Sequence, residues 1–256
     1  MTTSDPSPCE ILEWDTRFFG FHVARVRADT LTQELASQVQ VWCLQAGVRC
    51  LYFLSRADDA DTVRIAEDSH FRLVDMRMTF ARRLSSETRL TENPPGDSSP
   101  VRPVRSADIG ALQTIARQSY LDTRFYFDLN FPRRLSDRLY ETWIQRSCEG
   151  YADTVLVAEL AGEPVGYISC HLDTESRAGK IGLVGVSPHA QGQGLGSQLV
   201  QGAVEWFRAQ HMHTVSVATQ ARNCAAQRLY QRCGFLVQNV QLWYHKWYEH
   251  TGLTND

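Results

Sequence analysis

The chain has 256 residues, of which 43% are hydrophobic and 21% charged, and its formal net charge is -3. This balance indicates neither a nucleic-acid-binding face nor an acidic tail, and no apolar run approaches the ~20 residues that a membrane-spanning helix needs. Seven cysteines without a Cys-x-x-Cys pair, in a chain whose N-terminus has no basic or apolar signal region, predict reduced thiols in a cytoplasmic protein without a metal site.

Strands and helices are predicted to alternate along the first third of the chain. Apolar residues follow a period of two in the expected strands and a helical spacing in the expected helices. In chain order we expect a strand at Phe21–Val26, a helix at Gln33–Gln45, a strand at Arg49–Leu54, a helix at Thr62–Asp68 and a strand at Arg72–Phe80.

A break follows at Thr91–Pro100, where Pro94 and Pro95 stand together before a glycine and several polar residues. Such a segment sustains neither a helix nor an inner strand. We therefore expect an N-terminal domain over residues 1–90, a linker over residues 91–100 and a C-terminal domain over residues 101–256.

The second part of the chain shows a longer series of the same kind. A hairpin is expected to turn at Ala161–Glu163, and the last helix to end before Gly234. The expected helices are Ala107–Arg117, Leu135–Ser147, Gly194–Gln210 and Ala225–Cys233, and the expected strands are Val155–Leu160, Pro164–His171, Lys180–Val186, Thr214–Ala218 and Val237–Trp247. Elements that alternate in this way predict a layered α/β or α+β fold.

The two parts of the chain also match each other under a shift of 164 residues, without a gap. The shift lays Leu199–Val237 over Leu35–Leu73, and the order helix, strand, helix, strand agrees in both. The identical pairs include Leu199 with Leu35, Trp206 with Trp42, Arg228 with Arg64 and Phe235 with Phe71. We interpret the agreement as a sign of internal duplication.

The most informative segment joins the strand that ends near Val186 to the helix that begins near Gly194. Glycines at 192, 194 and 196 let the backbone approach a ligand, and the N-terminus of a helix carries positive potential. A phosphate or pyrophosphate is therefore the expected ligand, with a simple tight turn as the alternative. A dinucleotide fingerprint is excluded because Ser197 replaces its third glycine, and a P-loop because Gly-Lys-Ser/Thr is absent.

A second motif follows further along the chain, where Asn223 precedes Leu229-Tyr230-x-x-x-Gly234-Phe235. A strand, a Gln-Gly-x-Gly-x-Gly loop opening a helix, another strand, an asparagine and this run together resemble the GNAT superfamily of N-acetyltransferases. The resemblance covers about residues 150–256. It implies the GNAT fold, which is a mixed and mostly antiparallel sheet flanked by helices, with acetyl-CoA as co-substrate.

The resemblance also implies where the coenzyme binds. In GNAT enzymes the strand before the loop separates from its neighbour and holds the pantetheine arm, while the loop holds the pyrophosphate. The backbone N–H of Val184 would bind the thioester carbonyl and stabilise its oxyanion, which contributes ~3 kcal/mol in related acyl transfers. The implied coenzyme residues are Val184, Gly185, Val186, Gln191, Gly192, Gln193, Gly194, Leu195, Gly196, Ser197 and Asn223. For Asn223, an N-cap of the next helix is the alternative role.

Tyr230 matches the general acid of the family, which protonates the leaving thiolate. The alternative is a core tyrosine, because apolar residues surround it on the helix. Many GNAT enzymes carry a glutamate on the separated strand as general base, but Ala178–Val186 contains no acid. We therefore assign no base and expect the amine to lose its proton through water or to arrive neutral.

Outside these motifs the chain is similar to dTDP-fucosamine acetyltransferases. The similarity lies in Leu12–Val23, Thr123–Asp128, Leu139–Trp143 and Val217–Asn223. Those enzymes acetylate the 4-amino group of a dTDP-linked 4-amino-4,6-dideoxygalactose, and they combine a smaller, degenerate GNAT-like N-terminal domain with a complete C-terminal one. The resemblance implies the same arrangement here, with an inert first domain.

The acceptor implied by this resemblance is a small-molecule amine, specifically a dTDP-linked amino sugar. Arg124, Tyr126 and Asp128 are the expected substrate contacts, and a solvated loop is the alternative. The segment departs from the family at Tyr126-Phe127, where a residue run containing histidine is expected. Alternative functions are acetylation of a peptide, polyamine or antibiotic amine, and a non-catalytic acyl-CoA-binding module. No nucleic-acid or membrane partner is expected, and a homodimer is left open.

Overall fold

The structure is a computed structural model that describes residues 7–84 and 101–249. The linker predicted at 91–100 lies outside these residues. The chain divides into two compact units, of which the first comprises Met1–Arg77 and Val240–Asp256 and the second Met78–Asn239. In the parts that the structure describes, no helix is long and apolar enough to cross a membrane.

This division differs from the expected domains of residues 1–90 and 101–256. Strand β4 (Arg72–Arg83) begins in the first unit and ends in the second, whereas β10 (Leu236–Trp247) begins in the second unit and ends in the first. Amino-acid composition indicates a domain boundary only where a linker interrupts the series of helices and strands. Here the chain passes between the units inside two long, regular strands, so the composition gives no sign of it.

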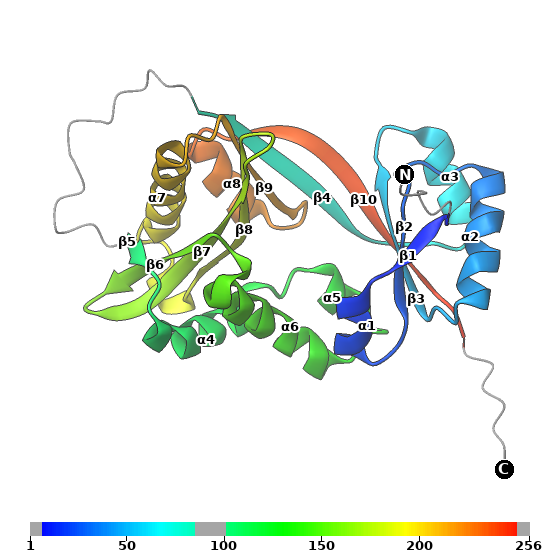
Figure 1. Ribbon diagram of the computed structural model, residues 1–256, viewed down its shortest axis with the longest axis horizontal. Helices are drawn as coiled ribbons and strands as arrows, with labels where there is room; N and C mark the ends of the chain where they lie inside the picture. Colours follow the sequence, from blue (N-terminus) through cyan, green and yellow to red (C-terminus); the bar gives the residue numbers. More distant parts are fainter. Residues whose placement is uncertain (1–6, 85–100, 250–256) are drawn as a thin grey trace, which may run out of the picture. The chain divides into compact units, whose positions relative to one another are not determined.

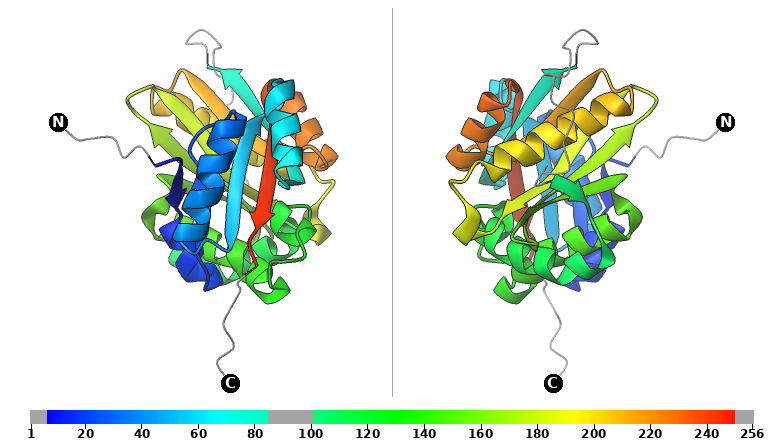
Figure 2. Two further views of the ribbon diagram at one scale, coloured as in Figure 1. Left: turned by 90° about the vertical axis from the view of Figure 1, so that its right-hand side faces the viewer. Right: turned by 90° about the vertical axis from the view of Figure 1, so that its left-hand side faces the viewer.

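The first unit is a small sheet with two helices on one face. Its elements are β1 (Cys9–Ile11), α1 (Glu13–Phe19), β2 (Val23–Val26), α2 (Gln33–Gln45), β3 (Cys50–Arg56), α3 (Ala60–Asp68), the first part of β4 and the last part of β10. Strand β2 pairs in parallel with β3, while β1 pairs with β2 and β10 with β3 in antiparallel. Helices α2 and α3 lie against this sheet (Figure 2, left), where Val39, Cys43 and Ala66 meet Phe53 and Tyr244 in a continuous core.

The second unit is larger and contains the loop and the motif that the sequence singled out. Its helices are α4 (Ile109–Ser119), α5 (Arg124–Phe127), α6 (Arg133–Arg146), α7 (Leu195–Ala209) and α8 (Cys224–Arg232), and its strands are β5 (Val101–Pro103), β6 (Thr154–Leu160), β7 (Glu163–Asp173), β8 (Ala178–Val186) and β9 (Thr214–Gln220), with the last part of β4. Their order in the sheet is β4-β9-β8-β7-β6-β5. Only β8 and β9 pair in parallel among the strands from β5 to β9, so the sheet is mixed and mostly antiparallel, as the sequence predicted.

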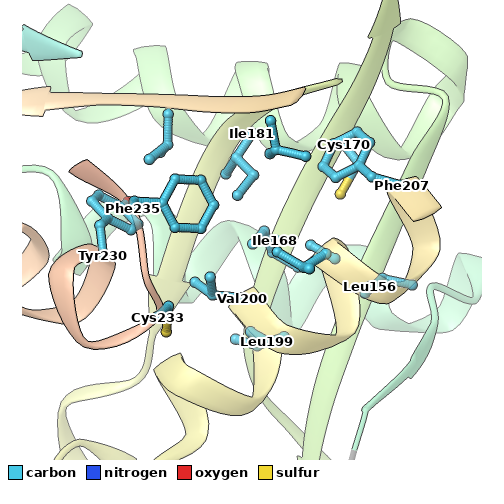
Figure 3. Packing of buried hydrophobic residues seen from close by; sticks show 14 of the residues in the cluster. Leu156, Ile168, Cys170, Ile181, Leu199, Val200, Phe207, Tyr230, Cys233 and Phe235 are labelled. Carbon is cyan, nitrogen blue, oxygen red and sulfur yellow. The ribbon is translucent and has the colours of Figure 1, made fainter. Parts of the chain in front are cut away.

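Helices cover both faces of this second sheet (Figure 1). A Cβ added to Gly166 on β7 would lie 3.1 Å from the Leu199 side chain of α7, while the next residue, Tyr167, bonds to Tyr120 at the end of α4. Because successive strand residues point to opposite faces, α7 and α4 lie on opposite sides of the sheet. Figure 3 shows the α7 side of the core, where Leu199, Val200 and Phe207 pack against the strands.

The expected internal repeat has a structural counterpart. Under the shift of 164 residues, β3 coincides with β9, α3 with α8, and β4 with β10, each at both ends. The caps correspond as well, since Asp59 accepts the N–H of Thr62 at the start of α3, and Asn223 accepts the N–H of Ala226 at the start of α8.

Candidate active site

Strand β8 has one backbone edge that its neighbour leaves open. Strand β9 pairs with β8 only over Ala178–Ile181. On the other edge β7 continues much further, to the pair of Gly166 with Val186. Beyond Ile181, therefore, one edge of β8 has no strand partner in the described part of the chain.

The hydrogen bonds of β8 show which residues face this open edge. The N–H of Ser187 donates to the carbonyl of Val165 on the β7 side, with an N–O distance of 2.8 Å. Because the backbone groups of successive residues point to alternate edges of a strand, Gly185 also faces β7. Val184 and Val186 face the open edge. The N–H of Val184 therefore faces the open edge, and its role at the oxyanion stays a prediction.

Two side chains bond to the carbonyls on this edge. The Tyr120 hydroxyl donates to the Val184 oxygen at 2.9 Å, and the Gln191 amide donates to the Val186 oxygen at 3.1 Å. Gln191 stands at the start of the glycine loop, so its side chain ties the loop to the open strand. No sequence pattern pointed to Tyr120, which comes directly after the last residue of α4.

The glycine loop presents the uncapped start of α7. Gly192 and Gly194 have φ angles of +79° and +81°, a backbone region that residues with a side chain rarely adopt. Gly194 is the N-cap of α7, no side chain caps this helix, and its first turn holds no acid. By contrast, Thr32 caps α2 and Asp59 caps α3. Within the described residues, neither a capping side chain nor an acid of the first turn offsets the positive potential at the start of α7, which suits an anion.

Asn223 is the N-cap of α8, which is the alternative role that the sequence offered for it. Its side-chain oxygen accepts the backbone N–H of Ala226 at 3.0 Å and so begins α8. Helix α8 lies close to the start of α7, because a Cβ on Gly196 would come within 3.3 Å of Leu229. A contact between Asn223 and the coenzyme stays a prediction.

Tyr230 lies on α8 with its ring in the core of the second unit (Figure 3). Its side chain is 4% exposed, and its ring lies 5.9 Å from that of Phe80 and 6.2 Å from that of Phe235. Burial raises the pKa of the Tyr230 phenol above its ordinary value. The hydroxyl therefore keeps its proton at neutral pH, which is the state that a general acid needs.

The three expected substrate contacts stand on or beside α5, and they contact residues of α5, of α6 and of the turn between these helices. The Tyr126 hydroxyl donates to Asp137 at 2.9 Å, and Asp128 accepts the backbone and side-chain N–H groups of Asn130. The Arg124 guanidinium lies 4.3 Å from the centre of the Phe125 ring. The Tyr126 contact joins α5 to α6 and the other contacts are local, and a role in substrate binding stays a prediction for all three.

The family model for the acetyltransferase (GNAT) family matches residues 118–235. This segment is a GNAT acetyltransferase domain. It contains the open edge of β8, the glycine loop and Tyr230, and GNAT acetyltransferases use acetyl-CoA as co-substrate. Within the described residues, no group of three or more His, Cys, Asp or Glu side chains is placed to hold a metal ion.

Two curated proteins and one solved structure show how far the similarity extends. The chain is 28% identical over 243 residues to the dTDP-fucosamine acetyltransferase of Escherichia coli, covering 93% of this chain and 97% of that protein. It is 28% identical over 152 residues to the spore coat polysaccharide biosynthesis protein SpsD of Bacillus subtilis, covering 57% of this chain and 50% of that one. The chain thus spans about half the length of SpsD. A GCN5-related N-acetyltransferase from Sphaerobacter thermophilus has the same fold, with a TM-score of 0.62 at 18% identity over 93% of this chain and 76% of that one.

Proposed function

We propose that this protein transfers the acetyl group of acetyl-CoA to the amino group of a nucleotide-linked 4-amino-4,6-dideoxy sugar. The observation that carries the acetyl transfer is the open edge of β8 beside the uncapped start of α7. The acceptor rests on the similarity to dTDP-fucosamine acetyltransferase, which extends over 93% of the chain and includes the segments outside the coenzyme motif. The protein SpsD, which is named for polysaccharide biosynthesis, agrees with a sugar acceptor.

The coenzyme would lie along the open edge of β8. The pantetheine arm would bond to the backbone of Val184 and Val186 as an additional strand does, and the pyrophosphate would accept N–H groups from Gly192 to Ser197. The carbonyls of Val184 and Val186 already have side-chain donors, whereas their N–H groups face the open edge. The edge therefore offers donors to the thioester carbonyl and to the arm.

The reaction would proceed by direct attack of the amine. Its nitrogen forms a bond to the thioester carbon, and the carbonyl oxygen takes negative charge beside the Val184 N–H. The carbon–sulfur bond then breaks, the Tyr230 hydroxyl gives its proton to the thiolate, and water returns a proton to the tyrosine. The surplus proton of the amine leaves through water, since β8 carries no acid between Ala178 and Val186.

The first unit would be a degenerate copy of the second that does no chemistry. Its counterpart of Tyr230 is Ala66, which is completely buried in the core. Its counterpart of α7 is α2, which Thr32 caps and which has Glu34 in its first turn. A cap and an acid at that place oppose the binding of a pyrophosphate.

The acceptor is tested by a panel of amines with acetyl-CoA, in which release of free thiol is measured. We expect the highest kcat/KM on a dTDP-linked 4-amino-4,6-dideoxy sugar, with lower values on the free amino sugar, polyamines, peptides and amine antibiotics. A higher kcat/KM on one of the other amines would reassign the acceptor. Tight binding of acetyl-CoA without turnover of any amine would favour a non-catalytic acyl-CoA-binding module.

The two roles of Asn223 can be separated by two substitutions. Asn223→Ala removes the cap of α8 and should lower the free energy of unfolding by about 1 kcal/mol. Asn223→Asp keeps a capping oxygen but adds a negative charge, so stability should stay close to wild type while the Kd of acetyl-CoA rises. Urea unfolding and calorimetric titration measure the two effects. An unchanged Kd in Asn223→Asp would leave Asn223 with the capping role alone.

A further inference from the structure

A pair of tyrosine hydroxyls lies at the open edge of β8, outside the residues to which the family motif assigns a role. The Tyr120 hydroxyl donates to the Val184 carbonyl at 2.9 Å, and the Tyr167 hydroxyl donates to the Tyr120 oxygen at 3.2 Å. The Tyr120 ring stacks on that of Tyr140, with 4.2 Å between ring centres and 14° between ring planes. Two hydrogen bonds and a stacked ring thus fix the position of the Tyr120 hydroxyl.

This hydroxyl lies beside the atom that would hold the thioester. The N–H and the carbonyl of one strand residue point to the same edge, so the Val184 carbonyl that Tyr120 bonds lies on the edge that carries the Val184 N–H. A thioester bound to that N–H would place its reacting carbon close to the Tyr120 oxygen. The second unit contains all of these residues.

The hydrogen-bonding capacity of Tyr120 shows what it can offer a substrate. A phenol has one donor hydrogen and two acceptor lone pairs. The hydrogen is directed to Val184, and Tyr167 occupies one lone pair, so one acceptor position remains. Tyr120 is partly exposed, whereas Tyr167 behind it is completely buried. Of the two hydroxyls, that of Tyr120 is the one that bonds to the open edge of β8, so a ligand on this edge would lie beside it.

An amine N–H is a group that the remaining acceptor position of the Tyr120 oxygen could bind. We propose that Tyr120 orients the acceptor amine, with its oxygen accepting one N–H so that the nitrogen lone pair faces the thioester carbon at Val184. This inference rests on the proposed acetyl transfer and adds a substrate-contacting residue to it. The surroundings of Tyr120, chiefly its burial and then the nearby Tyr167, raise the pKa of its phenol well above the ordinary value. Tyr120 therefore stays protonated and acts by orienting the amine, not by removing its proton.

The test compares two substitutions that each remove one hydroxyl. Tyr120→Phe keeps the ring that stacks on Tyr140 and removes the acceptor. Tyr167→Phe keeps that acceptor and removes only the hydrogen bond behind it. With acetyl-CoA and the amine that the wild-type protein uses best, we expect Tyr120→Phe to lower kcat/KM for the amine about 10-fold or more, and Tyr167→Phe to lower it less. In Tyr120→Phe the kcat/KM for the amine should fall by a larger factor than the rate at which acetyl-CoA is hydrolysed without amine.

Each other outcome overturns the inference in a distinguishable way. An unchanged kcat/KM in Tyr120→Phe would remove Tyr120 from amine recognition. A weakened binding of acetyl-CoA in Tyr120→Phe, with hydrolysis and amine transfer lowered equally, would show that the hydroxyl only holds β8 in place. If wild type turns over no amine of the panel, the proposed function itself fails, before any variant is compared.

Discussion

Replacing Gly194 with glutamate is expected to abolish measurable binding of acetyl-CoA. The φ angle of Gly194 is +81°, so any side chain there strains the backbone by roughly 1 kcal/mol. A Cβ at this position meets no atom within 4 Å, and therefore the new side chain has room to extend from the loop. Its carboxylate would stand at the start of α7, compete for the N–H groups of the first turn and repel the pyrophosphate.

Calorimetric titration with acetyl-CoA measures this effect, and two variants separate its causes. Gly194→Ala adds the backbone strain without the charge and should weaken binding far less. Gly110→Glu adds the same charge in the first turn of α4, where Gly110 is exposed and a Cβ meets no atom within 4 Å. It should leave the affinity unchanged. If Gly194→Glu folds as wild type does by circular dichroism and still binds acetyl-CoA, the pyrophosphate lies elsewhere.

The parts of the fold that the sequence predicted well are those with a regular apolar period. Helix α2 spans Gln33–Gln45, as predicted, because its buried residues repeat at helical spacing. Helix α3 was expected from Thr62 but begins two residues earlier, at Ala60, because the Asp59 side chain caps it there. The shortest elements, such as β1 (Cys9–Ile11) and α5 (Arg124–Phe127), were missed because three or four residues show no period.

The sequence predicted only those parts of the site whose residues lie close together in the chain. The glycine loop and the start of α7 lie within a few consecutive residues, and their backbone geometry follows from residue type. The Tyr120 hydroxyl bonds to a carbonyl 64 residues away and accepts from a tyrosine 47 residues away, and no spacing in one sequence encodes such contacts. The end of the pairing between β8 and β9 at Ile181 is likewise a property of the sheet, to which neighbouring residues give no clue.

The second large effect is expected from Tyr230→Phe, which should lower kcat by about 10²-fold or more. The phenylalanine ring can keep the contacts with Phe80 and Phe235 in the core, so the fold and the Kd of acetyl-CoA should stay close to wild type. What is lost is the proton for the departing thiolate. Because burial raises the pKa of this phenol, the protonated form persists as the pH rises, and wild-type kcat should not fall on account of this group up to about pH 10.

The measurement is kcat against pH for wild type and Tyr230→Phe, with acetyl-CoA and the amine saturating. Tyr244→Phe is the matched control, since Tyr244 is completely buried in the core of the first unit and its hydroxyl has no hydrogen-bond partner within the described residues. Loss of that hydroxyl should change neither kcat nor the Kd of acetyl-CoA. An equal, small loss of activity in both variants would mean that Tyr230 only packs in the core, as its contacts with Phe80 and Phe235 alone would allow. A loss of kcat confined to Tyr230→Phe, with coenzyme affinity and stability retained, assigns the proton transfer to Tyr230, because a ring that packs equally well lacks only the hydroxyl.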